Sequence, residues 1–109
     1  MSKWTNPTTK EKLEIYKKTN PITGSGLAVN GQCAFHGIMI KTDGTNNLAL
    51  TLYDNVSAAG APLIPDSIVV LGSARVTKYE FNKPIIAQNG IFVSGTCAGL
   101  WTWQVYYDK

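Results

Sequence analysis

The sequence has few of the residues on which enzyme chemistry depends. Histidine occurs once, as His36, and cysteine occurs twice, as Cys33 and Cys97. No carboxylate or second histidine lies near His36 in sequence to set its tautomer, so we expect it to be structural. One histidine and two widely separated cysteines match no zinc spacing. These absences predict a protein that is not an enzyme and that holds no cofactor or metal.

Charge is also scarce, and arginine is nearly missing. Only 16% of the residues are charged, and arginine occurs once. Residues 1–18 hold five lysines and two glutamates, which accounts for the whole net charge of +3. Nucleic-acid binders carry denser clusters of lysine and arginine, so we expect no nucleic-acid partner. The basic segment fits docking on an acidic surface, with a simple contribution to solubility as the alternative.

Long hydrophobic runs are missing as well. No apolar stretch follows Met1, and no run reaches the length of a membrane-spanning helix. We therefore expect a soluble protein made in the cytoplasm, with no membrane association. In that compartment Cys33 and Cys97 stay reduced, which favours two buried thiols. A disulfide formed later stays open as an alternative if their strands prove adjacent.

What the sequence does contain is the pattern of β-strands. Near the C-terminus, Trp101, Trp103, Val105 and Tyr107 recur at every second position, which is typical of a strand with one buried face. Turn residues recur about every ten positions between similar segments. The chain is predicted to be all-β, a single antiparallel β-sandwich of jelly-roll-like form with about eight strands. The expected strands are residues 12–18, 27–30, 32–42, 48–53, 68–71, 76–81, 85–87, 91–93 and 101–107.

Three local details follow from this pattern. Pro84 is expected to separate two strands and to lie at a sheet edge or crossover. Residues 94–96, with their central glycine, are expected to form a turn. Simple alternation places Phe35 and Met39 on one face of their strand and His36 on the other.

Two groups of side chains are candidates for a binding function. Asp43 and Asp54 flank one hairpin in the manner of calcium ligands, but Asp-Gly and Asp-Asn turns explain both residues without an ion. Aromatic side chains could stack on sugar rings, although core packing better explains the terminal tryptophans. Tyr53 and Tyr106 are therefore the better candidates for an exposed contact.

The first residues of the chain follow no strand or helix period. Residues 1–12 are polar and contain a proline, so they are predicted to form an extended N-terminal arm preceding the sandwich domain at residues 13–109. Trp4 on such an arm is expected to tuck into a groove of its own domain or of a neighbouring subunit. Together with Lys10 and Lys12, it is the candidate partner-binding site.

Two segments carry a resemblance to a known class of proteins. They are HGIMIKTDGTNNLALTLYDNVSAAGAPLI, from His36 to Ile64, and NGIFVSGTCAGLWTWQVYYDK, from Asn89 onward. The order of a glycine-bearing strand, a short hairpin, a Leu-Tyr-Asp-Asn strand end, a small-residue loop and a terminal aromatic strand resembles small β-sandwich structural proteins in virions of tailed bacteriophages.

The resemblance implies a virion location and no catalytic residues. The favoured function is that of a capsid decoration, or cement, protein that binds the major capsid protein or other virion subunits and stabilises the shell. A homo-oligomer, with a trimer favoured, is implied. The alternative is a tail or fibre component that contacts host-surface glycans, and a cytoplasmic enzyme has little support.

Overall fold

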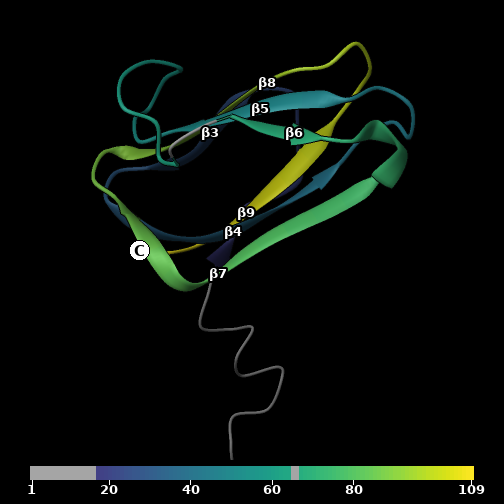
Figure 1. Ribbon diagram of the computed structural model, residues 1–109. Coiled ribbons are helices and arrows are strands. Elements are labelled where there is room, and N and C mark those ends of the chain that lie inside the picture. Colours follow the sequence, from purple (N-terminus) through teal and green to yellow (C-terminus); the bar gives the residue numbers. More distant parts are fainter. Residues whose placement is uncertain (1–16, 65–66) are drawn as a thin grey trace, which may run out of the picture.

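The computed structural model describes residues 17–64 and 67–109, which form two antiparallel β-sheets packed face to face (Figure 1). The all-β sandwich predicted from the sequence is confirmed. Sheet A contains β1 (Lys17–Lys18), β2 (Ile22–Thr23), β4 (Cys33–Lys41), β7 (Val76–Ala87) and β9 (Thr102–Asp108). Sheet B contains β3 (Gly26–Asn30), β5 (Leu48–Tyr53), β6 (Ile68–Val70) and β8 (Gly90–Thr96), and a short 3-10 helix, η1 (Gly72–Ala74), precedes β7.

The strand order is that of a jelly roll. Sheet A has the order β1-β9-β4-β7, with β2 also paired to β9, and sheet B has the order β3-β8-β5-β6. Because β1 and β2 both pair with β9, they act as one interrupted strand. All the remaining connections cross from one sheet to the other, except the connection from β5 to β6, which stays within sheet B. Eight strands in two such sheets make the double Greek key of a jelly roll.

A β-bulge in β4 changes which residues face the core. The pairing of β4 with β9 shifts register between Phe35 and Gly37, so His36 is the extra residue. Phe35 faces inward before the bulge, whereas Ile38 and Ile40 face inward after it. The prediction that Phe35 and Met39 share a face was therefore wrong, because an inserted residue reverses the alternation beyond it.

Pro84 does not divide the chain into two strands, as the sequence had suggested. β7 is one strand of twelve residues at the edge of sheet A. Its pairing with β4 jumps from Phe35 opposite Ile85 to Gly37 opposite Glu80, which leaves Pro84 inside a wide bulge. A proline has no N–H to donate, so a bulge at an edge strand tolerates it. The predicted edge position is confirmed.

The last two strands differ in how well the sequence predicted them. Residues 94–96 continue β8 and pair with β5, so the turn expected there was wrong. Gly95 is needed in that strand because a Cβ atom would lie 2.7 Å from the ring of Trp101. In β9 the predicted alternation is confirmed, with Trp103 and Val105 fully buried.

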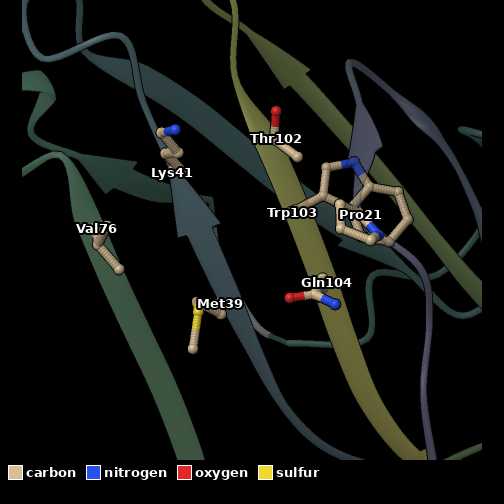
Figure 2. Close-up of a pocket in the computed structure, with 7 residues that line it drawn as sticks. All are labelled: Pro21, Met39, Lys41, Val76, Thr102, Trp103 and Gln104. Carbon is tan, nitrogen blue, oxygen red and sulfur yellow. The ribbon is translucent and has the colours of Figure 1, made fainter.

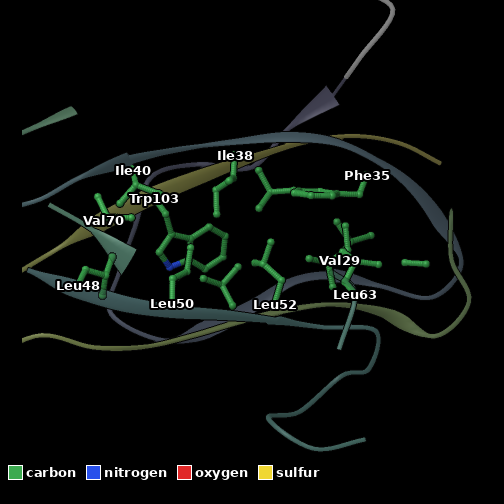
Figure 3. Packing of buried hydrophobic residues seen from close by; sticks show 14 of the residues in the cluster. Val29, Phe35, Ile38, Ile40, Leu48, Leu50, Leu52, Leu63, Val70 and Trp103 are labelled. Atoms are coloured by element: carbon green, nitrogen blue, oxygen red, sulfur yellow. The ribbon is translucent and has the colours of Figure 1, made fainter. Parts of the chain in front are cut away.

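The core fills the space between the two sheets. Ile38, Ile40 and Trp103 of sheet A face Leu48 and Leu50 of sheet B (Figure 3). Phe35 lies at the other end of the core, with its ring centroid 5.5 Å from that of Phe81. Apart from Phe81, each of these side chains is 0–1% exposed. Hydrophobic burial between the sheets is therefore the main stabilising contribution.

Candidate binding surfaces

The charged residues of the strands are all in sheet A. Its strands carry lysines, one glutamate and one aspartate, whereas β3, β5, β6 and β8 contain no charged residue. The outer face of sheet B is therefore an uncharged surface. Removing such a face from water does not require any ion to lose its hydration, so it suits contact with another protein.

Three rows of side chains cross the outer face of sheet B. The first row joins Leu27, Phe92 and Tyr53, which are register partners on β3, β8 and β5. The second contains Ser94 and Thr51, whose hydroxyl lies 3.0 Å from that of Ser67. The third joins Thr96, Ala49 and Val69. Val69 is 64% exposed and gives this face its most accessible apolar side chain.

The outer face of sheet A carries both charged and apolar side chains and has a depression. The depression has a volume of about 330 Å³ and lies over β4 and β9, beside Pro21 (Figure 2). Its lining combines Met39 and Val76 with the polar side chains of Thr102 and Gln104, and Lys41 is its one charged residue. Its lining includes neither a carboxylate nor a histidine, which leaves Lys41 as its one titratable side chain.

An ion pair lies on the same outer face, along β7. The Nζ atom of Lys78 is 3.0 Å from Oε1 of Glu80. The hydrogen bond and the negative charge of Glu80 raise the pKa of Lys78. Both side chains are at least half exposed, so they remain accessible to a further charged partner.

Asp43 organises the loops at one end of the sandwich. Its Oδ1 atom accepts hydrogen bonds from the backbone N–H groups of Thr45 and Asn46, each at 2.8 Å. These bonds lower the pKa of Asp43, because they stabilise the ionised carboxylate. A Cβ atom on Gly99 would lie 1.8 Å from the Asp43 carboxylate, so only glycine allows this approach. The turn chemistry predicted for Asp43 is present.

Asp54 has the corresponding position at the opposite end of β5. Its carboxylate accepts the backbone N–H of Gln88 at 3.0 Å and that of Asn89 at 2.8 Å. These bonds hold the turn between β7 and β8 against the end of β5. Asp43 and Asp54 thus serve separate turns, and the described residues contain no group of three or more His, Cys, Asp or Glu that could hold a metal.

The two cysteines lie in different parts of the sandwich and are both free. Cys33 begins β4 in sheet A, is 4% exposed, and has its pKa raised by burial. The Cys97 sulfur follows β8 and lies 3.7 Å from the carbonyl oxygen of Asn46, in the Asp43 loop region. Both thiols are free, but the prediction of two buried thiols holds only for Cys33, because Cys97 is partly exposed.

The residues predicted from sequence as a binding site do not form one surface. Trp4, Lys10 and Lys12 lie outside the described residues. Tyr53 and Tyr106 lie on the outer faces of opposite sheets, so they do not form one sugar-stacking platform.

Both tryptophans of the terminal segment belong to the core, since Trp101 is 6% and Trp103 is 1% exposed. Sequence reasoning missed the uncharged face of sheet B. The absence of charge in residues 26–30, 48–53, 68–70 and 90–96 is visible in the sequence, but it acquires meaning only when these four segments are known to form one sheet.

Comparison with protein-family models, with curated proteins and with solved structures finds no match to this chain. In the part of the chain that the structure describes, no helix is long and apolar enough to cross a membrane.

Proposed function

We propose that this chain is a non-enzymatic structural subunit of a tailed-bacteriophage virion, and that it decorates and stabilises the capsid shell. The sequence resemblance suggests this setting. The jelly roll is compatible with it, because viral capsid proteins commonly use this architecture, although a fold hosts many functions.

The observation that carries the proposal is the uncharged outer face of sheet B. A soluble domain usually covers its surface with interspersed charges, and this face lacks them across four strands. Exposed Val69 and the row of Leu27, Phe92 and Tyr53 provide apolar area that a partner can cover. A shell subunit that meets this face would bury it without burying ions.

The N-terminal arm would extend this contact. In the proposal, residues 1–12 reach across a neighbouring subunit, with Trp4 as the apolar anchor and Lys10 and Lys12 directed to acidic groups of the shell. A second attachment point raises the strength of binding for a domain that is small for a stable interface.

Co-sedimentation with empty shells tests the role of the uncharged face. Val69→Lys places a charge on the outer face of sheet B, and Ile86→Lys makes the same change on sheet A at a residue that is 51% exposed. Val69→Lys should weaken shell binding by about tenfold or more, because an ion is buried without a partner. Ile86→Lys should bind as the unmodified chain does. Equal binding by both variants would remove the proposed role of sheet B.

Deletion of residues 1–12 tests the arm separately. The truncated chain should keep its melting transition and lose binding to shells. Undiminished binding would show that the sandwich alone supplies the contact.

A tail or fibre protein that contacts host glycans is the second candidate. It is favoured by one observation, the partly exposed Tyr53 beside Phe92 on an uncharged face, because sugar rings stack on aromatic side chains. Binding to a glycan panel that is lost in Tyr53→Ala would favour this function. An absence of binding across the panel would leave the decoration protein as the proposal.

A further inference from the structure

The free edge of β7 is the longest unpaired strand edge in the described part of the chain. β7 has twelve residues and pairs only with β4, whereas β1, β2 and β6 have two or three residues and β3 has five with a register shift. An exposed edge offers backbone N–H and C=O groups to another strand. Lys83, Pro84 and the bulge protect the second half of β7, so the available edge is the regularly paired segment Val76–Glu80 together with Phe81, which follows it.

The hydrogen-bond pattern shows which residues of β7 point their backbone toward the free side. The carbonyl of Arg75 accepts the N–H of Thr42 at 2.7 Å, and residues of an antiparallel ladder alternate in direction. The carbonyl of Arg75 and the backbone groups of Thr77 and Tyr79 therefore point at β4. Lys78 and Glu80 direct theirs away from the sheet, as does Val76.

An incoming antiparallel strand must pair its own outward-directed residues with these. For a second copy of β7, three nearby registers satisfy that condition. Pairing centred on Lys78 sets the two Lys78 side chains opposite each other, and pairing centred on Glu80 sets two carboxylates opposite each other. Pairing centred on Tyr79 instead sets each Lys78 opposite Glu80 of the second copy. Opposite charges at facing positions stabilise a strand pair, and like charges destabilise it.

We infer that β7 is a self-association site, at which two copies of this chain pair antiparallel through Thr77–Phe81, centred on Tyr79. Lys78 and Glu80 of the two copies would form a cluster of four alternating charges on the outer face. Lys78 and Glu80 of each copy would exchange backbone hydrogen bonds with Glu80 and Lys78 of the other. The contact is two-fold, unlike the trimer that the resemblance implies, and it does not rest on the proposed function.

The same charges explain why a second copy is the partner. An uncharged strand in this register would give Lys78 and Glu80 no charged partner on the incoming chain. Charged residues on an edge strand therefore disfavour pairing with an arbitrary strand. A second copy supplies the matching pattern automatically through two-fold symmetry. About five residues a side is a small interface, so the dimer should be concentration dependent.

Sedimentation equilibrium of the full chain, from about 10 μM to about 1 mM, tests the inference. The unmodified chain should reach dimer mass within that range. Lys78→Glu places four carboxylates at the contact, and Glu80→Lys places four ammonium groups there, so each variant should weaken dimerisation by about tenfold or more. The double variant Lys78→Glu/Glu80→Lys restores alternation and should dimerise again. Both side chains are exposed, so thermal melting of each variant should match that of the unmodified chain.

A mixture of the two single variants is the most selective measurement. One chain then carries glutamate at both positions and the other carries lysine at both, so the mixture should form heterodimers although neither variant dimerises alone. A monomer throughout the range, a trimer, or dimerisation unchanged by either single variant would overturn the inference. Failure of the mixture to associate, when the unmodified chain dimerises, would refute the register centred on Tyr79.

Discussion

The indole N–H of Trp103 donates a hydrogen bond to the carbonyl oxygen of Gly24 at 2.7 Å. Gly24 has a φ of 80°, in the left-handed region, and lies in the short connection between β2 and β3. The bond therefore ties a core side chain of β9 to the point where the chain leaves sheet A for sheet B.

We expect Trp103→Phe to lower the free energy of unfolding by about 2 kcal/mol, because the Gly24 carbonyl loses its partner and the core loses volume. Thr23→Val is the matched control, since it removes only an exposed contact with Thr102 at 3.3 Å and should change stability by less than about 0.5 kcal/mol. Chemical denaturation measures both. Equal changes in the free energy of unfolding for the two variants would show that the Trp103 side chain contributes no more to stability than the exposed Thr23 contact.

Gly37 allows β4 and β7 to approach each other at the bulge. A Cβ atom there would lie 2.4 Å from the carbonyl oxygen of Tyr79, so Gly37→Ala should destabilise the fold by about 1–3 kcal/mol. At Gly26, also in a strand, the nearest atom would be 3.5 Å away, and Gly26→Ala should be nearly neutral. Thermal melting that ranks the two variants in the reverse order would contradict this account of the bulge.

Asp54 holds the turn between β7 and β8 through its bonds to Gln88 and Asn89. We expect Asp54→Ala to cost about 1–2 kcal/mol and to speed hydrogen exchange at those two amides. Asp108→Ala removes an exposed carboxylate from the end of β9 and serves as the control. Unchanged hydrogen exchange at Gln88 and Asn89 in Asp54→Ala would show that Asp54 does not hold this turn.

The pKa of Asp43 gives stability a defined pH dependence. Its pKa in the folded state is lowered by the N–H groups of Asn46 and Thr45, so the folded state favours the ionised form. This contribution is fully present above the unfolded-state pKa, about 3.9, and is lost as pH falls through the folded-state value. An NMR titration should place the Asp43 midpoint below about 3.9, the value for an unfolded chain. Asp43→Asn should make stability fall less steeply in acid, and a midpoint above the unfolded value would contradict the prediction.

The two thiols should react at different rates. Burial raises the pKa of Cys33 and reduces its thiolate fraction, whereas Cys97 is partly exposed. We expect a thiol reagent to modify one cysteine per folded chain rapidly and the second only slowly, with both reacting quickly in denaturant. Cys33→Ser should remove the slow phase. Loss of the fast phase in that variant would reverse the assignment.

The sequence predicted those elements whose pattern is local. The alternation from Trp101 to Tyr107 required only the period of a strand and a buried face, and both are present. The turn at Asp43 also followed from local chemistry, because its side chain bonds to backbone groups two and three positions ahead.

The errors arose where pairing between distant strands decides the outcome. His36 is a bulge only because β4 aligns with β9 and β7, which no local pattern reveals. The glycine in residues 94–96 favours a turn by local pattern. In the structure Gly95 lies in a strand, where the absence of a side chain leaves room for the ring of Trp101. Long-range packing overrides local preference at these sites.

The candidate surfaces depend on topology in the same way. Val69, Ala49 and Thr96 become one row only after β5 is placed between β6 and β8. The free edge of β7 likewise follows from its position at the end of sheet A.

Electron cryomicroscopy of virus particles from the source of this chain tests the proposed decoration function most directly. A decoration protein should give regular density for a jelly roll over the outer shell lattice, with the outer face of sheet B turned toward the shell. Density confined to the tail, or a particle without this chain, would contradict it.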